Sequence, residues 1–256
     1  MLVAIDVGNT ETKLGCFDAA GELIHTWRIA TDVRRTPDEY GVLFGQLFTG
    51  GGVDLEAVDG VAIASVVPKL DSMLETACAR SFAVAPLFLK PDVQRVIPLA
   101  TAVPRESGAD LVAAAIGGRA RFGAPLIVVS YGTATVFIAI SSAGEYLGVA
   151  IAPGITISID ALIGRTAKLP QIALETPERA IGRTTEAALQ SGIVYGFAGQ
   201  TEAIVARMRA ELGVPAKVVA TGGLAEPFAK HTPVVDAVDP HLSLVGLRLF
   251  FEAARA

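Results

Sequence analysis

Two segments of the chain share one pattern, a predicted strand that ends in a glycine-bearing turn. Residues 3–10 read Val-Ala-Ile-Asp-Val-Gly-Asn-Thr, and residues 127–134 read Ile-Val-Val-Ser-Tyr-Gly-Thr-Ala, which aligns with the first without a gap. Backbone N–H groups in such a turn can approach a phosphate, and a carboxylate at the strand end can hold the metal ion of that phosphate. Two such turns facing each other would bind a nucleotide. The main chemical difference is Asp6 in the first turn against Ser130 in the second.

The first turn carries the more complete set of ligands. Asp6 stands where its side chain can reach a hydrated Mg²⁺, while Gly8, Asn9 and Thr10 offer donors to phosphate. Asn and Gly are also ordinary turn residues, so a plain polar hairpin is the alternative interpretation.

The rest of the chain favours the nucleotide-binding interpretation. In the second turn, Thr133 and Thr135 can add hydroxyl donors to phosphate. A third glycine turn, Thr221-Gly222-Gly223, follows another predicted strand. The three turns therefore come in the order phosphate turn, phosphate turn, nucleoside turn.

Alternating strands and helices predict an α/β framework around these turns. Thr36-Pro-Asp-Glu39 is typical of a helix start, with an N-cap, a proline and first-turn acids. The pattern restarts at Leu126, so we place a boundary between tightly packed lobes of residues 1–117 and 118–256. Strands are predicted over residues 2–6, 12–17, 23–29, 60–64, 84–89, 134–140 and 218–220, with a further strand that starts at Leu126 and ends before its glycine turn. Helices are predicted over residues 36–48, 70–77, 111–116, 155–163, 184–212 and 242–254.

Composition narrows the class of ligand. The 256 residues are 52% hydrophobic, which is ample for a buried core, and the formal net charge is −5. No basic stripe suggests nucleic acid or an anionic membrane, so a small soluble ligand is expected. Cys16 and Cys78 form no CxxC pattern and are expected to be buried thiols. With no basic leader and no long apolar stretch, we expect a cytoplasmic protein without a membrane span.

Motifs along almost the whole chain give it a specific resemblance. In order and spacing, the chain resembles the type III pantothenate kinases of the actin-like and sugar-kinase superfamily. The motifs are Asp6-Val-Gly-Asn-Thr10, Ser65-Val-Val-Pro68, Gly108-Ala-Asp110, Gly132-Thr-Ala134, Pro153-Gly154, Thr166-Ala-Lys-Leu-Pro170, Ile181-Gly182 with Thr185, Gln190-Ser-Gly192 and Thr221-Gly-Gly223.

The resemblance implies a fold and a reaction. The fold is a pair of ribonuclease-H-like, actin-like lobes with an ATP cleft between them. The reaction passes the γ-phosphate of ATP to the primary hydroxyl of pantothenate, the first committed step towards coenzyme A. Asp110 matches the general base of the family, a role that a positioned carboxylate can fill. The alternative interpretation is structural, because Ser107-x-x-Asp110 also has the spacing of a helix capping box.

Other roles follow from the resemblance, position by position. Family members are dimers, so a homodimer is expected, with Thr185 reaching pantothenate across the interface. Asp6 is the expected Mg²⁺ ligand, and Ser130 matches the site of a monovalent cation, K⁺ or NH₄⁺. The remaining matches are ATP-binding residues Asp6, Val7, Gly8, Asn9, Thr10, Lys13, Gly132, Thr133, Gly222 and Gly223, and pantothenate-binding residues Gly108, Ala109, Asp110, Leu111 and Thr185.

Three positions depart from the family pattern. Leu111 replaces an arginine that can form paired hydrogen bonds to a carboxylate or phosphate. Ser130 replaces the aspartate of the second turn, and a hydroxyl is a far weaker cation ligand than a carboxylate. Val149 stands where the family has a second glycine after Gly148. Its side chain is therefore expected to crowd a surface where the backbone approaches substrate.

These departures keep two further functions open. The chain can be a degenerate paralogue that serves as a regulatory or partner subunit of a complete pantothenate kinase, in a heteromer. It can also be a phosphotransferase of the same fold with a different hydroxyl acceptor. The retained Asp6 and Asp110 favour an active, though impaired, pantothenate kinase.

Overall fold

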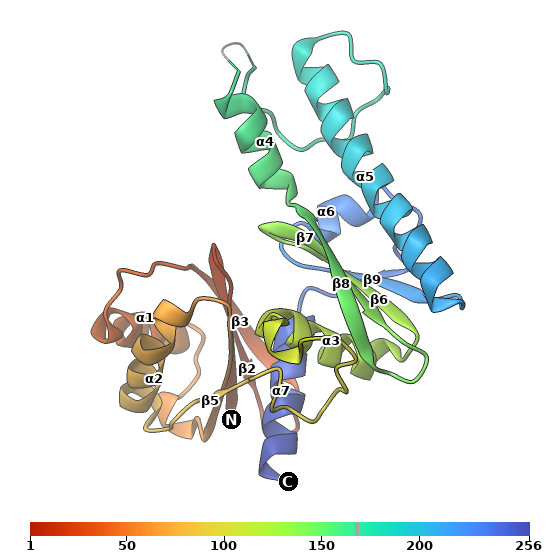
Figure 1. Cartoon of the computed structure of the whole chain (residues 1–256). Helices are drawn as coiled ribbons and strands as arrows, with labels where there is room; N and C mark the ends of the chain where they lie inside the picture. Colours follow the sequence, from red (N-terminus) through yellow and green to blue (C-terminus); the bar gives the residue numbers. More distant parts are fainter. Residues whose placement is uncertain (167–168) are drawn as a thin grey trace. The chain divides into compact units, whose positions relative to one another are not determined.

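The computed structural model describes residues 1–166 and 169–256, which form two compact units (Figure 1). The first unit comprises Met1–Arg121 together with Leu242–Ala256, and the second comprises Phe122–His241. This division differs from the expected lobes of residues 1–117 and 118–256 because the C-terminal segment lies with the first unit. The sequence has no linker-like composition at either point where the chain passes from one unit to the other. The boundaries are therefore visible only in the packing.

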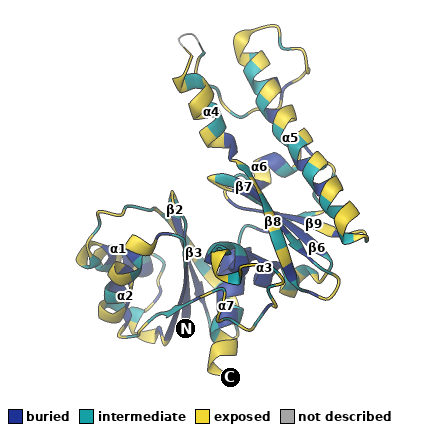
Figure 2. Ribbon diagram, viewed as in Figure 1, coloured by how far each residue is buried: buried dark blue, intermediate teal, exposed yellow. Residues whose placement is uncertain are grey.

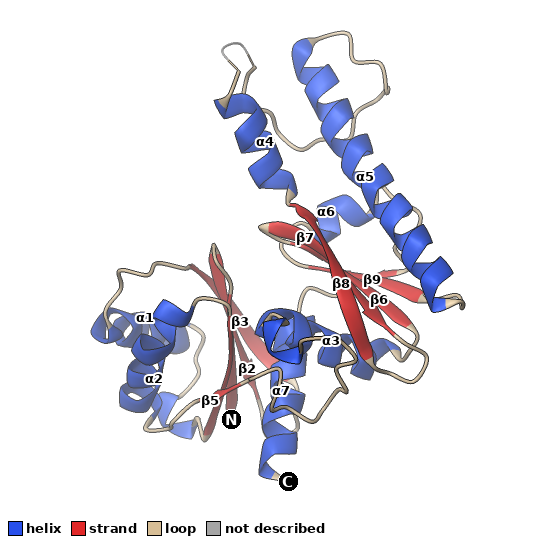
Figure 3. Cartoon of the chain, viewed as in Figure 1, coloured by secondary structure: helices blue, strands red, loops and turns tan. Residues whose placement is uncertain are grey.

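The first unit is built on a five-stranded mixed sheet (Figure 3). Its order is β3-β2-β1-β4-β5, with β1, β2 and β3 antiparallel and β4 and β5 parallel to β1. The strand expected over residues 84–89 is reduced to two residues. The strands are β1 (Leu2–Val7), β2 (Glu11–Phe17), β3 (Leu23–Ala30), β4 (Gly60–Ser65) and β5 (Leu87–Phe88).

Two helices cover one face of this sheet. Thr36 caps α1 as expected, because its hydroxyl accepts from the Glu39 N–H while the Glu39 carboxylate accepts from the Thr36 N–H. Val3 and Ile5 of β1 pack on that face with Phe44 of α1. The helical segments of the unit are α1 (Pro37–Gly50), η1 (Leu55–Ala57), α2 (Pro68–Phe82), η2 (Pro104–Glu106), α3 (Ala109–Phe122) and α7 (Leu242–Arg255).

The opposite face of the sheet carries small residues and is covered by α7 (Figure 2). Ala4 pairs with Gly15 on β2, and a Cβ at Gly15 would lie 2.9 Å from Cδ1 of Leu244. A Cβ at Gly60 would overlap the ring of Phe251. Because side chains alternate along a strand, this close face also includes the position of Asp6.

Helices α3 and α7 cross at two glycines. A Cβ at Gly246 would overlap the carbonyl oxygen of Ala113, and one at Gly117 would overlap the carbonyl oxygen of Leu242. Both overlaps involve backbone, which cannot rotate away as a flexible side chain can. The crossing therefore requires glycine at both positions, and these contacts fix the position of α7 along α3.

We expect Gly246→Ala to destabilise the protein by about 1–3 kcal/mol, since overpacking forces a backbone shift. Gly45→Ala in α1 is the matched control, because a Cβ there meets nothing within 4 Å. That control should gain about 0.5–1 kcal/mol from the loss of a helical glycine. Urea unfolding at 25 °C measures both changes, and equal responses would contradict the close crossing.

The second unit repeats the connectivity of the first. Its sheet has the order β10-β9-β6-β7-β8, with the first three strands in the chain antiparallel and the last two parallel to β6. The unit contains β6 (Leu126–Tyr131), β7 (Ala134–Ile140), β8 (Tyr146–Pro153), β9 (Lys217–Thr221), β10 (Ala237–Val238), α4 (Ile155–Gly164), α5 (Thr185–Leu212) and α6 (Ala225–Ala229).

The repeated 3-2-1-4-5 order confirms the expected α/β class with two lobes of the ribonuclease-H-like, actin-like type. Helices α5 and α6 pack on the sheet of the second unit, where Val205 and Phe228 meet Phe137 of β7. Strand β8, helix α6 and strand β10 were not predicted. Cys16 and Cys78 are buried free thiols, as expected. Among the described residues, no helix is both long and apolar enough to cross a membrane.

Candidate active site

Asp6 lies at the carboxyl end of β1, opposite Lys13 on β2 and Ala64 on β4. Asp6 is buried, with only 7% of its surface exposed. Its Oδ2 accepts a hydrogen bond of 2.6 Å from the Ser243 hydroxyl, and the Lys13 Nζ lies 4.0 Å from the same oxygen. Sequence reasoning missed Ser243, since it stands 237 positions away in the chain and belongs to no recognisable motif.

Asp110 is the second residue of α3, and its Oδ1 accepts a 2.8 Å hydrogen bond from the Leu111 N–H. The helix does not begin with the expected capping box. Ser107 ends η2, and the Gly108 carbonyl accepts from the Val112 N–H, so the cap position falls on Gly108. The alternative capping box therefore does not form with Ser107 as its cap, although Asp110 does lie in the first turn of α3.

The pKa of Asp110 is raised from 3.8 to about 6. Removal from water is the largest cause, and the negative charge of Asp6 adds to it. The Leu111 N–H and the charge of Lys13 oppose the shift without cancelling it. Asp110 is thus a carboxylate at neutral pH with a proton affinity well above that of an ordinary aspartate, as suits a general base.

The first turn presents its tip to solvent. Val7 is buried, whereas Asn9 and Thr10 are exposed. The Gly8 N–H donates to the Glu11 carbonyl at 3.1 Å and so closes the hairpin instead of pointing to a ligand. Of the three expected phosphate donors, Asn9 and Thr10 are the two at the exposed tip.

The residues around Asp6 suit a magnesium ion by their chemistry. Asp6 and Asp110 bring two carboxylates near one ammonium group, that of Lys13, which leaves a negative local charge. Within residues 1–166 and 169–256, no group of three or more His, Cys, Asp or Glu side chains could enclose a metal ion. Mg²⁺ commonly binds through one or two carboxylates plus water and phosphate oxygens, so the residues present fit it.

In the second unit, the two remaining glycine turns meet at one edge of the sheet. Ser130 on β6 and Thr221 on β9 are paired in parallel, so both strands end together. Gly222 has a φ of +96°, and a Cβ there would lie 2.5 Å from the carbonyl oxygen of Tyr131. Glycine is therefore required for this approach. The exposed residues at this edge are Gly132, Thr133 and Gly223.

Pro153-Gly154 joins the same edge, because a Cβ at Gly154 would overlap the backbone of Thr133. Thr135 does not share the exposure of Thr133. It is 1% exposed, and its Oγ1 has no hydrogen-bond partner among the described residues. The phosphate-binding hydroxyl expected at Thr135 is thus withdrawn into the sheet.

The positions that depart from the family pattern have distinct surroundings. Leu111 is partly buried directly after Asp110, and Ser130 is partly buried at the end of β6. Val149 lies on the outward face of β8, where it is 38% exposed. Its side chain therefore adds to the exposed apolar surface of β8.

Thr185 is exposed at the start of α5. The hydroxyl of Thr184 caps this helix by accepting from the Ala187 N–H at 3.2 Å, so the cap does not depend on Thr185. The motif Thr166-Ala-Lys-Leu-Pro170 includes residues 167–168, which lie outside the described residues.

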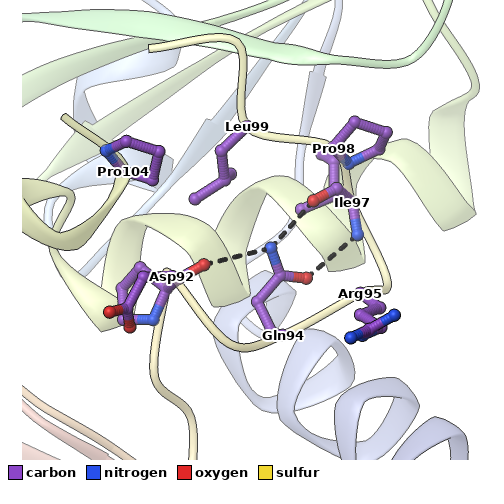
Figure 4. A pocket seen from close by; sticks show the side chains of 8 residues that line it. Asp92, Gln94, Arg95, Ile97, Pro98, Leu99 and Pro104 are labelled. Carbon is purple, nitrogen blue, oxygen red and sulfur yellow. Dashed lines mark hydrogen bonds between the residues drawn. The ribbon is translucent and has the colours of Figure 1, made fainter. Parts of the chain in front are cut away.

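A pocket of about 210 Å³ lies in the loop between β5 and η2 (Figure 4). The amide of Gln94 shapes it, because Nε2 donates to the Ile97 carbonyl at 2.8 Å and Oε1 accepts from the Ile97 N–H at 3.0 Å. Neither Asp6 nor Asp110 lines this pocket. It is therefore separate from the carboxylate pair.

Comparison with known proteins identifies the fold and the family of the chain. A crystal structure described as a Baf family transcriptional activator from Campylobacter jejuni matches 99% of this chain and 98% of its own, with a TM-score of 0.61 and 17% identity, which supports the fold alone. Type III pantothenate kinases of Myxococcus xanthus and Anaeromyxobacter sp. (strain Fw109-5) are 48% and 50% identical, over 98% and 100% of both chains respectively. The family model for type III pantothenate kinase matches residues 2–207. The chain therefore belongs to the type III pantothenate kinase family.

Proposed function

We propose that the protein transfers the γ-phosphate of ATP to the primary hydroxyl of pantothenate, with Asp110 as the general base. The observation that carries the proposal is the retained pair of Asp6 and Asp110, whose proximity helps to raise the pKa of Asp110 to about 6. In the transfer, Asp110 accepts the hydroxyl proton while the new P–O bond forms. The bond between the β- and γ-phosphates breaks, and ADP leaves.

The other site residues have supporting roles in the proposal. Asp6 would hold the Mg²⁺ of the nucleotide, which would offset phosphate charge, and the ammonium group of Lys13 would bind the phosphates. The exposed turn residues Gly132, Thr133 and Gly223 bind the phosphates and nucleoside. Gly108, Ala109 and Leu111 flank pantothenate beside Asp110.

The direct assay is ADP release with and without pantothenate at saturating Mg²⁺ and ATP. Release that depends on pantothenate supports the proposal. A screen of other hydroxyl compounds in the same assay tests the alternative that the protein phosphorylates a different acceptor. A compound with a higher turnover than pantothenate would replace pantothenate as the proposed substrate. No acceptor-dependent turnover with any nucleotide or cation would overturn the proposed reaction.

We also propose that the protein is a homodimer formed through the second unit. Strand β8 lies at the edge of its sheet and presents apolar side chains outward. Contiguous exposed apolar surface of this kind is typical of an interface. The exposed hydrophobic residues of this region are Leu147, Val149 and Ile151 of β8 and Ile157 and Leu162 of α4.

Ile151→Glu is expected to convert the dimer to a monomer, because the side chain is 68% exposed in the single chain and a charge would be buried by the partner. Light scattering coupled to size exclusion measures the mass. Val42→Glu, at a residue 60% exposed on α1, should leave the dimer intact. If both variants keep the wild-type mass, β8 is not the interface.

A second candidate function is that of a partner subunit. In this candidate function, Leu111 and Ser130 lower the activity of the chain's own site. The exposed Thr185 can still contact pantothenate in the site of another subunit. Co-expression with a complete type III pantothenate kinase should then give a heteromer more active than either chain. Failure of the two chains to associate would remove this candidate.

A further inference from the structure

Ser243 is a buried polar residue that neither the sequence motifs nor the proposed reaction uses. It is the second residue of α7 and only 7% exposed. Its Oγ donates a hydrogen bond of 2.6 Å to Oδ2 of Asp6. A short bond from a hydroxyl to a carboxylate is among the stronger hydrogen bonds in proteins. The C-terminal helix therefore reaches directly to the expected metal ligand.

The position of Ser243 is set by backbone contacts and not by its own side chain. One helical turn further along, Gly246 lies against the Ala113 carbonyl of α3, and the Leu242 carbonyl lies against Gly117. On the sheet side, Gly15 admits Leu244. Helix α7 is thus fixed both to the sheet that carries Asp6 and to the helix that carries Asp110.

The contact also constrains the carboxylate chemically. Ser243 and Lys13 both approach Oδ2, at 2.6 Å and 4.0 Å, so the polar contacts gather on one oxygen. A carboxylate fixed through one oxygen keeps one rotamer and presents the other oxygen in a constant direction. Without the hydroxyl, the longer approach of the Lys13 Nζ is the polar contact to Oδ2 that remains among the described residues, so Asp6 would be held less firmly.

We propose that Ser243 is a positioning residue that holds Asp6 in the orientation required to bind the magnesium ion of the nucleotide. This inference rests on the proposed function, since it assigns Asp6 to the metal ion of ATP. Helix α7 then acts through Asp6 without touching ATP, pantothenate or the reacting atoms.

The test measures binding of a fluorescent ATP analogue against Mg²⁺ concentration, in the absence of pantothenate. Ser243→Ala should raise the Mg²⁺ concentration for half-maximal binding by about 10- to 100-fold, as expected for a lost hydrogen bond to a charged group. In turnover assays, kcat should fall by a similar factor while the KM for pantothenate stays within about twofold.

Three further variants separate positioning from stability. Ser243→Thr keeps the hydroxyl and should recover most of the Mg²⁺ response. Ser243→Cys keeps the volume but donates weakly, so it should behave like Ser243→Ala and decides the matter if the alanine variant does not fold. Ser141→Ala removes another serine-to-carboxylate bond, 3.2 Å to Glu145 in the second unit, and should leave the Mg²⁺ response unchanged.

The outcomes are distinguishable from failure of the proposed reaction, because the binding assay needs no acceptor. A protein that binds Mg²⁺ and nucleotide normally but does not phosphorylate pantothenate would refute the reaction and leave the role of Ser243 standing. If Ser243→Ala or Ser243→Cys lowers only the unfolding temperature, with a wild-type Mg²⁺ response, Ser243 is a packing residue and the inference is overturned. A wild-type protein that binds no nucleotide would overturn it as well.

Discussion

Asp110→Asn is expected to lower pantothenate-dependent turnover strongly and at the same time to make the protein more stable. The loss of the general base should lower kcat by about 10²- to 10⁴-fold, because asparagine cannot accept the hydroxyl proton. Asparagine keeps an oxygen that can accept from the Leu111 N–H, so the local structure at the start of α3 should persist. A group that costs stability but is required for turnover is typical of an active site.

The gain in stability follows from the sign of the pKa shift. The pKa of Asp110 is raised from 3.8 to about 6 in the folded protein, so the folded state holds its proton after the unfolded state has lost it. Stability therefore falls as the pH rises between these two values and stays lower above them. The asparagine side chain of the variant never ionises, so the variant should be more stable above pH 6 by about 1–2 kcal/mol, a figure reduced because the partly exposed side chain is screened by water.

Urea unfolding at pH 8 and at pH 3.5 measures this effect, since the difference between variant and wild type should be present at pH 8 and absent at pH 3.5. Asp92→Asn, at an exposed carboxylate, should show no such difference. The wild-type rate should rise with pH through an apparent pKa near 6 and then level off. If the Asp110→Asn variant is less stable than wild type at pH 8, the conclusion that the ionised Asp110 side chain destabilises the folded protein is contradicted.

The double variant Leu111→Arg with Ser130→Asp is expected to raise the pantothenate-dependent kcat/KM by about 10²- to 10⁴-fold. Each restored charge should contribute about 1.5–3 kcal/mol, or roughly one to two decades, if the two act independently. The introduced guanidinium would supply paired hydrogen bonds beside Asp110. The introduced carboxylate at the end of β6 would bind a monovalent cation, so its share of the gain should require K⁺ or NH₄⁺.

The controls for this variant address mechanism. Leu111→Lys restores the charge without the planar, paired donors and should gain less than Leu111→Arg. Adding Asp110→Asn to the double variant should remove the gain, because the same base is used. If the double variant gains nothing, the site has been adapted to another acceptor instead of impaired for pantothenate.

Local sequence was sufficient wherever the determining contacts are local. Thr36 and Glu39 form their capping box within four residues, and Thr184 caps α5 in the same way. Asp6, placed at a strand end by an apolar run, lies at the end of β1 as predicted. The repeated strand and turn correctly indicated two units of one topology.

Long-range packing decided the features that were missed. Helix α7 belongs to the first unit, where glycines at positions 15 and 60 leave room for Leu244 and Phe251, and local sequence does not reveal this packing. Ser107 has capping-box spacing, yet it directly follows η2 and α3 begins only at Ala109, so the cap position falls on Gly108. Strand β8 is an exception, because the turn Ser141-Ser-Ala-Gly144 before it and Pro153-Gly154 at its end are local signals that could have predicted it.

In the candidate site, too, some residues could be predicted from local sequence and others only from the packing. Asp6 and Asp110 were identified from motifs, and the pKa of Asp110 depends on both. The contact from Ser243 could not be inferred from any spacing, because it arises from the crossing of α7 with α3. Turn chemistry can be read from a few neighbouring residues, whereas the groups that orient a carboxylate come from anywhere in the fold.

The most direct measurement is ³¹P NMR of a reaction with the wild-type protein, ATP, Mg²⁺ and pantothenate, followed with time. The account predicts a phosphomonoester signal of 4′-phosphopantothenate that grows in step with ADP and does not appear with Asp110→Asn. ADP with inorganic phosphate alone, or a phosphomonoester signal that persists in Asp110→Asn, would contradict it.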